Sequence, residues 1–238
     1  MSDSLKSLIF AAVMCLVCSV LLTTASTGLQ HFQEKNVILD KQKNIIKSVG
    51  LIQKEETYSP ERITQLYLDN IKPVWVDSDG RLNDATQRGE SDIPLYIYLK
   101  NDGIKAYIVP INSRGLWGRI LGYLAIENDG STISGFTIYK HSETPGLGGE
   151  IEKEWFQKNF VGKKIINREG RFVSIGIAKG PLKNKIPSKQ EINYVDGISG
   201  ATLTGKYLSA GIMEILHNYE PVSIKFRKNL IEKQPAEG

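Results

Sequence analysis

The N-terminal segment is the most apolar part of the chain. The 24 residues from Ser7 to Gln30 include no charged side chain. As an α-helix rising 1.5 Å per residue, this run would extend about 36 Å, enough to cross a hydrocarbon layer roughly 30 Å thick. The alternative is a cleaved signal peptide, for which Ala25-Ser26-Thr27 offers only a poor cleavage site. The long apolar run favours a retained single-pass membrane anchor over residues 1–30.

Residues 31–90 are predicted to form two helices and a polar loop. Between Gln33 and Val49, apolar residues recur on a charged background, which predicts an amphipathic helix ending at a glycine cap, Gly50. A second helix is expected to begin at Ser59-Pro60, with serine as N-cap and proline in the first turn. We expect it to end at Lys72-Pro73, because proline interrupts a helix.

The hydrophobic pattern then alternates with period two, which is typical of strands. Two antiparallel hairpins are predicted, each with a turn rich in asparagine, aspartate and glycine. A short helix and one more strand follow, so the fold class is expected to be α+β. The predicted ranges are 95–99 with 106–109, 120–126 with 132–139, a helix over 152–160 and a strand over 172–178.

The most distinctive stretch runs from Asp196 to Thr204, before a predicted helix. Apolar residues at helical spacing indicate a helix from about Leu203 to Tyr219, with Thr202 or Thr204 as its N-cap. The first turn of a helix presents unpaired N–H groups, which favour a phosphate. Gly200 leaves room beside Thr202, so we interpret Thr202 as the attachment point of a phosphate-bearing cofactor. An ordinary capped helix is the alternative.

The same stretch resembles a known modification signal. Asp196, Ser199, Gly200, Ala201 and Thr202 match the pattern Asp-x-x-Ser/Thr-Gly-Ala-Thr of membrane flavoproteins. The resemblance implies that Thr202 carries covalent FMN through a phosphoester bond, installed by a separate flavin transferase that uses FAD.

Two further stretches resemble the same family, in the expected order. They are residues 141–149, which include Thr144-Pro145-Gly146, and Gly115-Leu116-Trp117-Gly118 followed by residues 122–126. The chain is thus similar to the covalent FMN-binding family, and within it to the membrane-anchored FMN subunit of the Na+-translocating NADH:quinone reductase. The resemblance covers the anchor and roughly residues 75–219.

The resemblance also implies the residues of the flavin site. Leu147 would pack on the isoalloxazine ring, and the amides of its loop would bond the ring's polar edge. From its place after a predicted strand, Lys179 is expected to face the phosphate or a ring carbonyl, with a solvated lysine as the alternative. The candidate cofactor-binding residues are Thr202, Ser199, Gly200, Ala201, Glu143, Thr144, Gly146, Leu147, Gly148 and Lys179. The expected division is an anchor over 1–30, a helical linker with the start of the soluble domain over 31–90, an FMN-binding domain over 91–224 and a charged tail over 225–238.

The function implied by the resemblance is electron relay rather than catalysis by the chain alone. Its expected partners are the other subunits of the reductase, a flavin transferase and the membrane. The expected location is the bacterial inner membrane, with the soluble domain on the periplasmic side. Two alternatives remain: the corresponding FMN subunit of the related ion-translocating ferredoxin:NAD reductase, and a non-redox membrane-anchored binding domain.

Charge and composition bear on three functional classes: nucleic-acid binding, metal binding and catalysis. The chain has 30 basic and 26 acidic residues, a net charge of +4, without a basic stripe of the kind that binds nucleic acid. Cys15 and Cys18 both lie in the apolar run, and no third cysteine is available for a metal. The three histidines are too scattered in sequence to suggest a metal triad or a catalytic set. Lys6 is the only basic residue before the apolar run, and several lysines follow it. This distribution of positive charge opposes export of the C-terminal part, although long domains can be translocated regardless of flanking charge.

Overall fold

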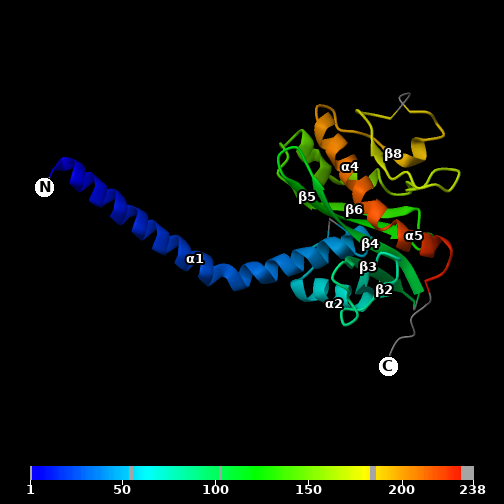
Figure 1. Ribbon diagram of the computed structural model, residues 1–238, viewed down its shortest axis with the longest axis horizontal. Coiled ribbons are helices and arrows are strands. Elements are labelled where there is room, and N and C mark those ends of the chain that lie inside the picture. Colours follow the sequence, from blue (N-terminus) through cyan, green and yellow to red (C-terminus); the bar gives the residue numbers. More distant parts are fainter. Residues whose placement is uncertain (1, 54–55, 102, 183–185, 232–238) are drawn as a thin grey trace. The chain divides into compact units, whose positions relative to one another are not determined.

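The computed structural model describes residues 2–53, 56–101, 103–182 and 186–231 (Figure 1). Two compact units divide the chain, Met1–Lys41 and Gln42–Gly238. Helix α1 (Asp3–Ser48) is continuous through the predicted anchor and the predicted amphipathic helix. Within the described residues it is the one helix long and apolar enough to cross a membrane.

The predicted glycine cap of α1 is confirmed. Gly50 has a φ of 72°, a left-handed conformation that glycine adopts without a steric penalty. Its N–H donates to Lys47 O at 3.1 Å, and Leu51 N donates to Ile46 O at 3.0 Å. These two bonds form the Schellman arrangement that satisfies the last carbonyl groups of a helix.

An antiparallel sheet of six strands, in the order β2-β1-β3-β4-β5-β6, is the centre of the second unit. The two predicted hairpins are confirmed as β3 with β4 and β5 with β6, so the α+β class with antiparallel hairpins is also confirmed. The strands are β1 (Ile71–Val76), β2 (Leu82–Asn83), β3 (Ile93–Lys100), β4 (Gly103–Arg114), β5 (Arg119–Glu127) and β6 (Ile133–Lys140).

Strand β1 corrects the predicted end of the second helix. Helix α2 (Pro60–Asn70) begins as expected, with Ser59 Oγ accepting from Arg62 N, but β1 starts directly after it. The segment Lys72-Pro73 therefore lies in a strand. Proline is tolerated there because β2 pairs with only Trp75 and Val76, which leaves that edge of β1 open at Pro73.

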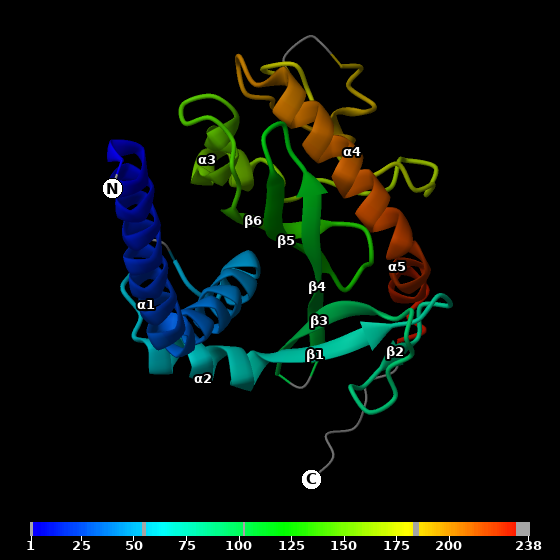
Figure 2. The ribbon, with the colours of Figure 1, turned by 60° about the vertical axis from the view of Figure 1, so that its left-hand side comes forward.

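The two faces of the sheet are covered by different helices. Helix α4 (Thr202–Asn218) lies along one face, where Leu208, Ile212 and Leu216 join Phe136 and other strand residues in the core (Figure 2). Side chains alternate between faces along a strand, so the neighbours of Phe136 point the other way. There the last turns of α1 cover the sheet, and Thr137 Oγ1 donates to Asn44 O at 3.4 Å.

The segment between β6 and α4 is less regular than the sequence pattern predicts. The helix predicted over 152–160 is shorter, α3 (Glu154–Lys158), and follows a 3-10 helix, η1 (Gly148–Glu152). Of the strand predicted over 172–178, only β7 (Gly176–Ile177) forms, in parallel with β8 (Tyr194–Val195), which follows the 3-10 helix η2 (Glu191–Asn193). Short parallel pairing of this kind depends on a distant partner, which the local pattern does not reveal.

Helix α5 (Glu220–Arg227) corrects the predicted start of the charged tail. The sequence predicts a loose tail from Lys225, but α5 includes Lys225 and continues to Arg227. Phe226 is buried and stacks on Tyr107 of β4, with ring centroids 4.4 Å apart. The Arg227 guanidinium donates to Gly130 O at 2.9 Å. The end of the helix is thus held by the core, and residues 232–238 of the predicted tail lie outside the described residues.

Candidate functional site

The site begins at the first turn of α4, next to the small-residue turn. The sequence predicts Thr202 or Thr204 as N-cap, but the cap is Ala201, and both threonines are inside the helix. Gly200 before it has a φ of 78°, which keeps this turn tight. Among the described residues, no side chain caps the start of α4. Its N-terminal N–H groups and positive dipole end are therefore suited to a phosphate.

The two threonines of this turn differ in accessibility. Thr202 is exposed, whereas Thr204 is 2% exposed and its hydroxyl donates to Glu143 Oε2 at 2.5 Å. The difference follows from helix geometry, since residues two apart point about 200° from each other. A group that modifies a threonine here can therefore reach Thr202 but not Thr204.

Glu143 connects the three stretches that carry the family resemblance. Its carboxylate is almost completely buried, and its other oxygen, Oε1, accepts from Leu116 N at 2.8 Å and from Trp117 N at 3.1 Å. With the bond from Thr204, this one side chain joins the loop after β4, the loop after β6 and the start of α4. The sequence predicts Glu143 as a flavin contact, and in the structure both of its carboxylate oxygens accept hydrogen bonds from the protein.

His141 fixes the backbone beside Glu143. The Glu143 N–H donates to His141 Nδ1 at 3.1 Å, so Nε2 carries the ring proton and lies 3.2 Å from Glu152 Oε2. This hydrogen bond is the main reason why the pKa of the Glu152 carboxyl is lowered. His141 therefore has a structural partner on each ring nitrogen.

Exposed apolar side chains flank the site. Leu147, one of the predicted flavin contacts, lies beside the turn: a Cβ added at Gly200 would come within 2.9 Å of Leu147 Cδ2. Leu203, next to Thr202, is half exposed, and Trp117 is 69% exposed. Thr144 and Gly146 of the same loop are exposed, whereas Gly148 is buried against Glu143. A planar aromatic ring can pack on such leucine side chains.

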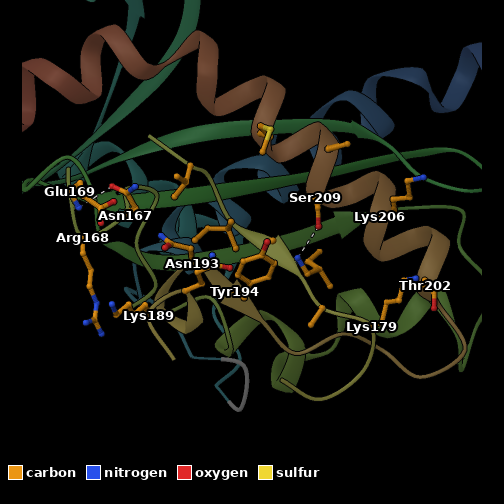
Figure 3. A pocket seen from close by; sticks show the side chains of 18 residues that line it. Asn167, Arg168, Glu169, Lys179, Lys189, Asn193, Tyr194, Thr202, Lys206 and Ser209 are labelled. Carbon is orange, nitrogen blue, oxygen red and sulfur yellow. Dashed lines mark hydrogen bonds between the residues drawn. The ribbon is translucent and has the colours of Figure 1, made fainter. Parts of the chain in front are cut away.

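A cleft of about 770 Å³ extends from Thr202 between α4 and the segment around β7 and β8. This volume is within the range of small-molecule sites, roughly 300–1,000 Å³. Thr202, Lys179 and Lys206 line one end, and Arg168 and Glu169 line the other (Figure 3).

Lys179 lies at this cleft because the segment around Ala178 packs directly against the segment around Gly197. A Cβ at Gly197 would lie 1.7 Å from Ala178 O, so only glycine fits there. Asp196 completes the junction, with its Oδ1 accepting from Leu182 N at 2.7 Å. The predicted residues Lys179 and Thr202 are thus brought to one cleft. Ser199 is exposed in the turn, and Ala201 is buried.

The sequence pattern did not lead us to two features of the site, the Lys206 side of α4 and the Glu143–Thr204 hydrogen bond. Lys206 is one helical turn after Thr202 and lines the same cleft, as do Ser209 and Met213 further along α4. Their spacing of three to four residues marks one helix face. This stripe lies beside the buried face of α4, and it could have been recognised from periodicity. The Glu143–Thr204 bond had no such signal, because its partners are 61 positions apart.

These residues fit an FMN group by their chemistry. An uncapped helix start with two lysines on the adjoining cleft suits the phosphate. The exposed Leu147 and Leu203 suit the apolar face of the isoalloxazine ring. The exposed Thr202 hydroxyl between these regions suits a tether. When bound, FMN supplies one- and two-electron transfer.

Comparison with known proteins identifies the family. The FMN-binding domain family matches residues 115–217, which include all three stretches. The NqrC subunit of the Na+-translocating NADH-quinone reductase of Vibrio anguillarum is 34% identical over 233 residues, 85% of this chain and 87% of that protein. The same subunit from Neisseria meningitidis is 34% identical over 226 residues, 84% of each chain.

Solved structures give the same result. The crystal structure of the NqrC subunit from Parabacteroides distasonis superposes with a TM-score of 0.69 and 31% identity, over 82% of this chain and 96% of that one. The Shewanella oneidensis NqrC structure has a TM-score of 0.65 and 21% identity over 82% of this chain and 99% of that one, which shows the shared fold. The chain therefore belongs to the NqrC family of the Na+-translocating NADH-quinone reductases, with an FMN-binding domain after an N-terminal apolar helix.

Proposed function

We propose that this chain is the covalently flavinylated electron-relay subunit of its reductase, with FMN joined to Thr202 by a phosphoester bond. The observation that carries the proposal is the contrast between the exposed Thr202 and the buried, hydrogen-bonded Thr204 at an uncapped helix start. Family membership supports the same interpretation over its two alternatives, the FMN subunit of the related ferredoxin:NAD reductase and a non-redox binding domain.

Attachment requires one bond to form and one to break. The Thr202 hydroxyl gives up its proton and forms a P–O bond to the FMN phosphorus of FAD. The bond from that phosphorus to the bridging oxygen breaks, and AMP leaves with the bridging oxygen. A flavin transferase would supply the base that takes the proton and the binding site for FAD.

The other residues of the site hold the attached group. Lys179 and Lys206, on the cleft beside Thr202, would offset the remaining charge of the phosphodiester. Leu147 would pack on the ring, and the amides of Gly146 and Gly148 would face its polar edge. Ser199, Gly200 and Ala201 keep the turn before Thr202 compact, and Thr144 borders the ring. A covalent tether suits a relay, because the carrier must not dissociate between donor and acceptor.

Family membership also supports a proposal for the partners and the location. We propose that the chain assembles with the other subunits of the reductase in the bacterial inner membrane, held by a single span within α1. The soluble domain would face the periplasm, where a flavin transferase modifies it. The apolar run has no charged residue, so sodium movement would belong to other subunits.

The decisive test locates the flavin on the chain. In native membranes, or after co-expression with a flavin transferase, mass spectrometry of the peptide containing residues 199–206 is expected to find FMN on Thr202. The Thr202→Ala variant is expected to lose flavin fluorescence in the denatured gel band, because alanine has no oxygen to modify. Its thermal unfolding should match that of the unmodified wild type, since Thr202 is exposed. Fluorescence retained in Thr202→Ala, or FMN on Thr204, would refute the assignment.

A further inference from the structure

Glu143 is buried, and no described residue forms an ion pair with it. Among the described residues, its three hydrogen-bond donors are all neutral: the backbone N–H groups of Leu116 and Trp117, and the hydroxyl of Thr204. Burying a carboxylate is unfavourable unless hydrogen bonds satisfy its oxygens. Neutral donors fix the position of such a group rather than cancel its charge.

The backbone of two glycines packs closely around this carboxylate. A Cβ at Gly115 would lie 2.4 Å from Glu143 Oε1, and a Cβ at Gly148 would lie 2.5 Å from Thr204 Oγ1 and 2.8 Å from Glu143 Oε2. Real Cβ atoms do not approach so closely, so a larger residue at either position would displace the carboxylate. Glycines from two separate loops therefore enclose the same hydrogen bonds.

The network touches the parts of the site that would meet the flavin. The Thr204 bond holds the first turn of α4 with Thr204 inward, and Thr202 then faces outward. The two N–H bonds hold the loop that carries the exposed Leu116 and Trp117. The loop that contains Glu143 continues to Leu147, which lies against the turn at Gly200. One carboxylate thus aligns the tether and both flanking loops.

We propose that the Glu143–Thr204 hydrogen bond is a latch that presents Thr202 for flavin attachment and aligns the two loops that flank the attached ring. This inference rests on the proposed function. It assigns Glu143 and Thr204 as positioning residues, neither of which touches the transferred group. Loss of the latch leaves the Thr202 hydroxyl in place but lets the first turn and the loops move apart, so attachment becomes slower without becoming impossible.

The test uses variants that remove or keep the latch. Thr204→Val removes the hydroxyl at nearly constant volume, Thr204→Ser keeps it, and Glu143→Gln weakens the acceptor at the same size. The matched control is Tyr107→Phe, which deletes the buried Tyr107–Ser223 hydrogen bond of 2.7 Å elsewhere in the core. Two quantities are measured on the full chain in detergent: the initial rate of FMN transfer from FAD by a flavin transferase, followed on the 199–206 peptide, and the unfolding temperature before modification.

Thr204→Val and Glu143→Gln are expected to slow labelling of Thr202 by about tenfold or more, as loss of a hydrogen bond to a charged group implies. Thr204→Ser should be labelled at a rate within about threefold of wild type, because it keeps the hydroxyl. Tyr107→Phe should be labelled within about twofold of the wild-type rate. Its unfolding temperature should nevertheless fall by about as much as that of Thr204→Val, because both variants lose one buried hydrogen bond. The proposed role of this hydrogen bond is wrong if Thr204→Val is labelled at the wild-type rate, or if Tyr107→Phe slows labelling as much as Thr204→Val does. Absence of label in the wild type would instead contradict the proposed function. If Glu143→Gln does not fold, the valine and serine variants still decide.

Discussion

Individual residues near Thr202 have roles that depend on which way each side chain points. The motif around Gly200 predicts a modified threonine from sequence, because a small-residue turn before a helix leaves space for a phosphate. The same pattern favours Thr202 over Thr204, because Gly200 leaves room beside Thr202. The structure adds a difference in accessibility, since the rotation of α4 against the sheet buries Thr204 at Glu143 and exposes Thr202. The sequence indicates Glu143 as part of the site, but it does not indicate a positioning role.

A residue-scale prediction concerns Asp129, in the turn between β5 and β6. Its carboxylate accepts from Ser131 N and Thr132 N, both at 2.8 Å, and from both hydroxyl groups. Partial burial would raise the pKa of Asp129, but the hydrogen bonds from Thr132 and Ser131 together hold it below its usual value. A lowered folded-state pKa stabilises the protein above the unfolded-state pKa of about 3.9, and this stabilisation disappears as the pH falls through the folded-state pKa.

Asp129→Asn is therefore expected to reduce the free energy of unfolding by about 1–3 kcal/mol at neutral pH. The difference from wild type should shrink at an acidic pH below the unfolded-state pKa of about 3.9, as the wild-type carboxylate takes up its proton. Denaturant unfolding at the two pH values measures both effects. The exposed Asp69 provides the control, since Asp69→Asn should change the free energy by less than about 0.5 kcal/mol. An equal loss for Asp129→Asn at both pH values would contradict the role of the charge.

Whole elements are predicted best where their pattern is local. The helices α2 and α4 and both hairpins appear where periodicity and turn residues indicate them. Strand β1 is missed because Lys72-Pro73 is a helix-ending signal, whereas pairing with β3 draws the segment into the sheet. The short pair β7–β8 is mostly missed for a related reason, since its two strands are joined by a long connection.

An element-scale prediction tests how closely α1 meets the sheet. Gly135 lies in β6, and a Cβ there would be 2.0 Å from Ser48 O in the last turn of α1. Gly135→Ala is expected to push the end of α1 away and to lower the free energy of unfolding by about 1–3 kcal/mol, as in other overpacked cores. Gly103→Ala in β4 is the control, because its added Cβ would have only ordinary contacts at 3.8 Å. Equal unfolding temperatures for the two variants would show that α1 tolerates the added methyl group.

The division of the whole molecule falls within α1. The predicted boundary between anchor and linker is at residue 30, whereas the second compact unit starts at Gln42. Ile45 and Ile46 are buried in that unit, so the end of α1 belongs to its core. The apolar pattern marks the segment suited to lipid, but it does not reveal where the same helix starts to pack on protein.

A truncation series tests this division. A chain that begins at Gln42 is expected to unfold at nearly the same temperature as one that begins at Lys35, because residues 35–41 are exposed except for the half-buried Leu39. A chain that begins at Leu51 should be less stable by several kcal/mol, because it lacks two buried isoleucines, each worth roughly 2–5 kcal/mol. Circular dichroism during heating measures the difference. Equal stability of all three chains would place the end of α1 outside the core.

From the sequence came the features that depend on neighbours along the chain: the apolar anchor, the helices, the two hairpins and the small-residue turn at Thr202. Each follows from a periodicity or from turn chemistry, which act over a few residues. The folded molecule added the features that depend on distant contacts. Glu143 meets Trp117 across 26 positions and Thr204 across 61, and no local pattern records such a pairing. The accessible threonine was thus selected by packing, since burial of one hydroxyl turns the other toward solvent.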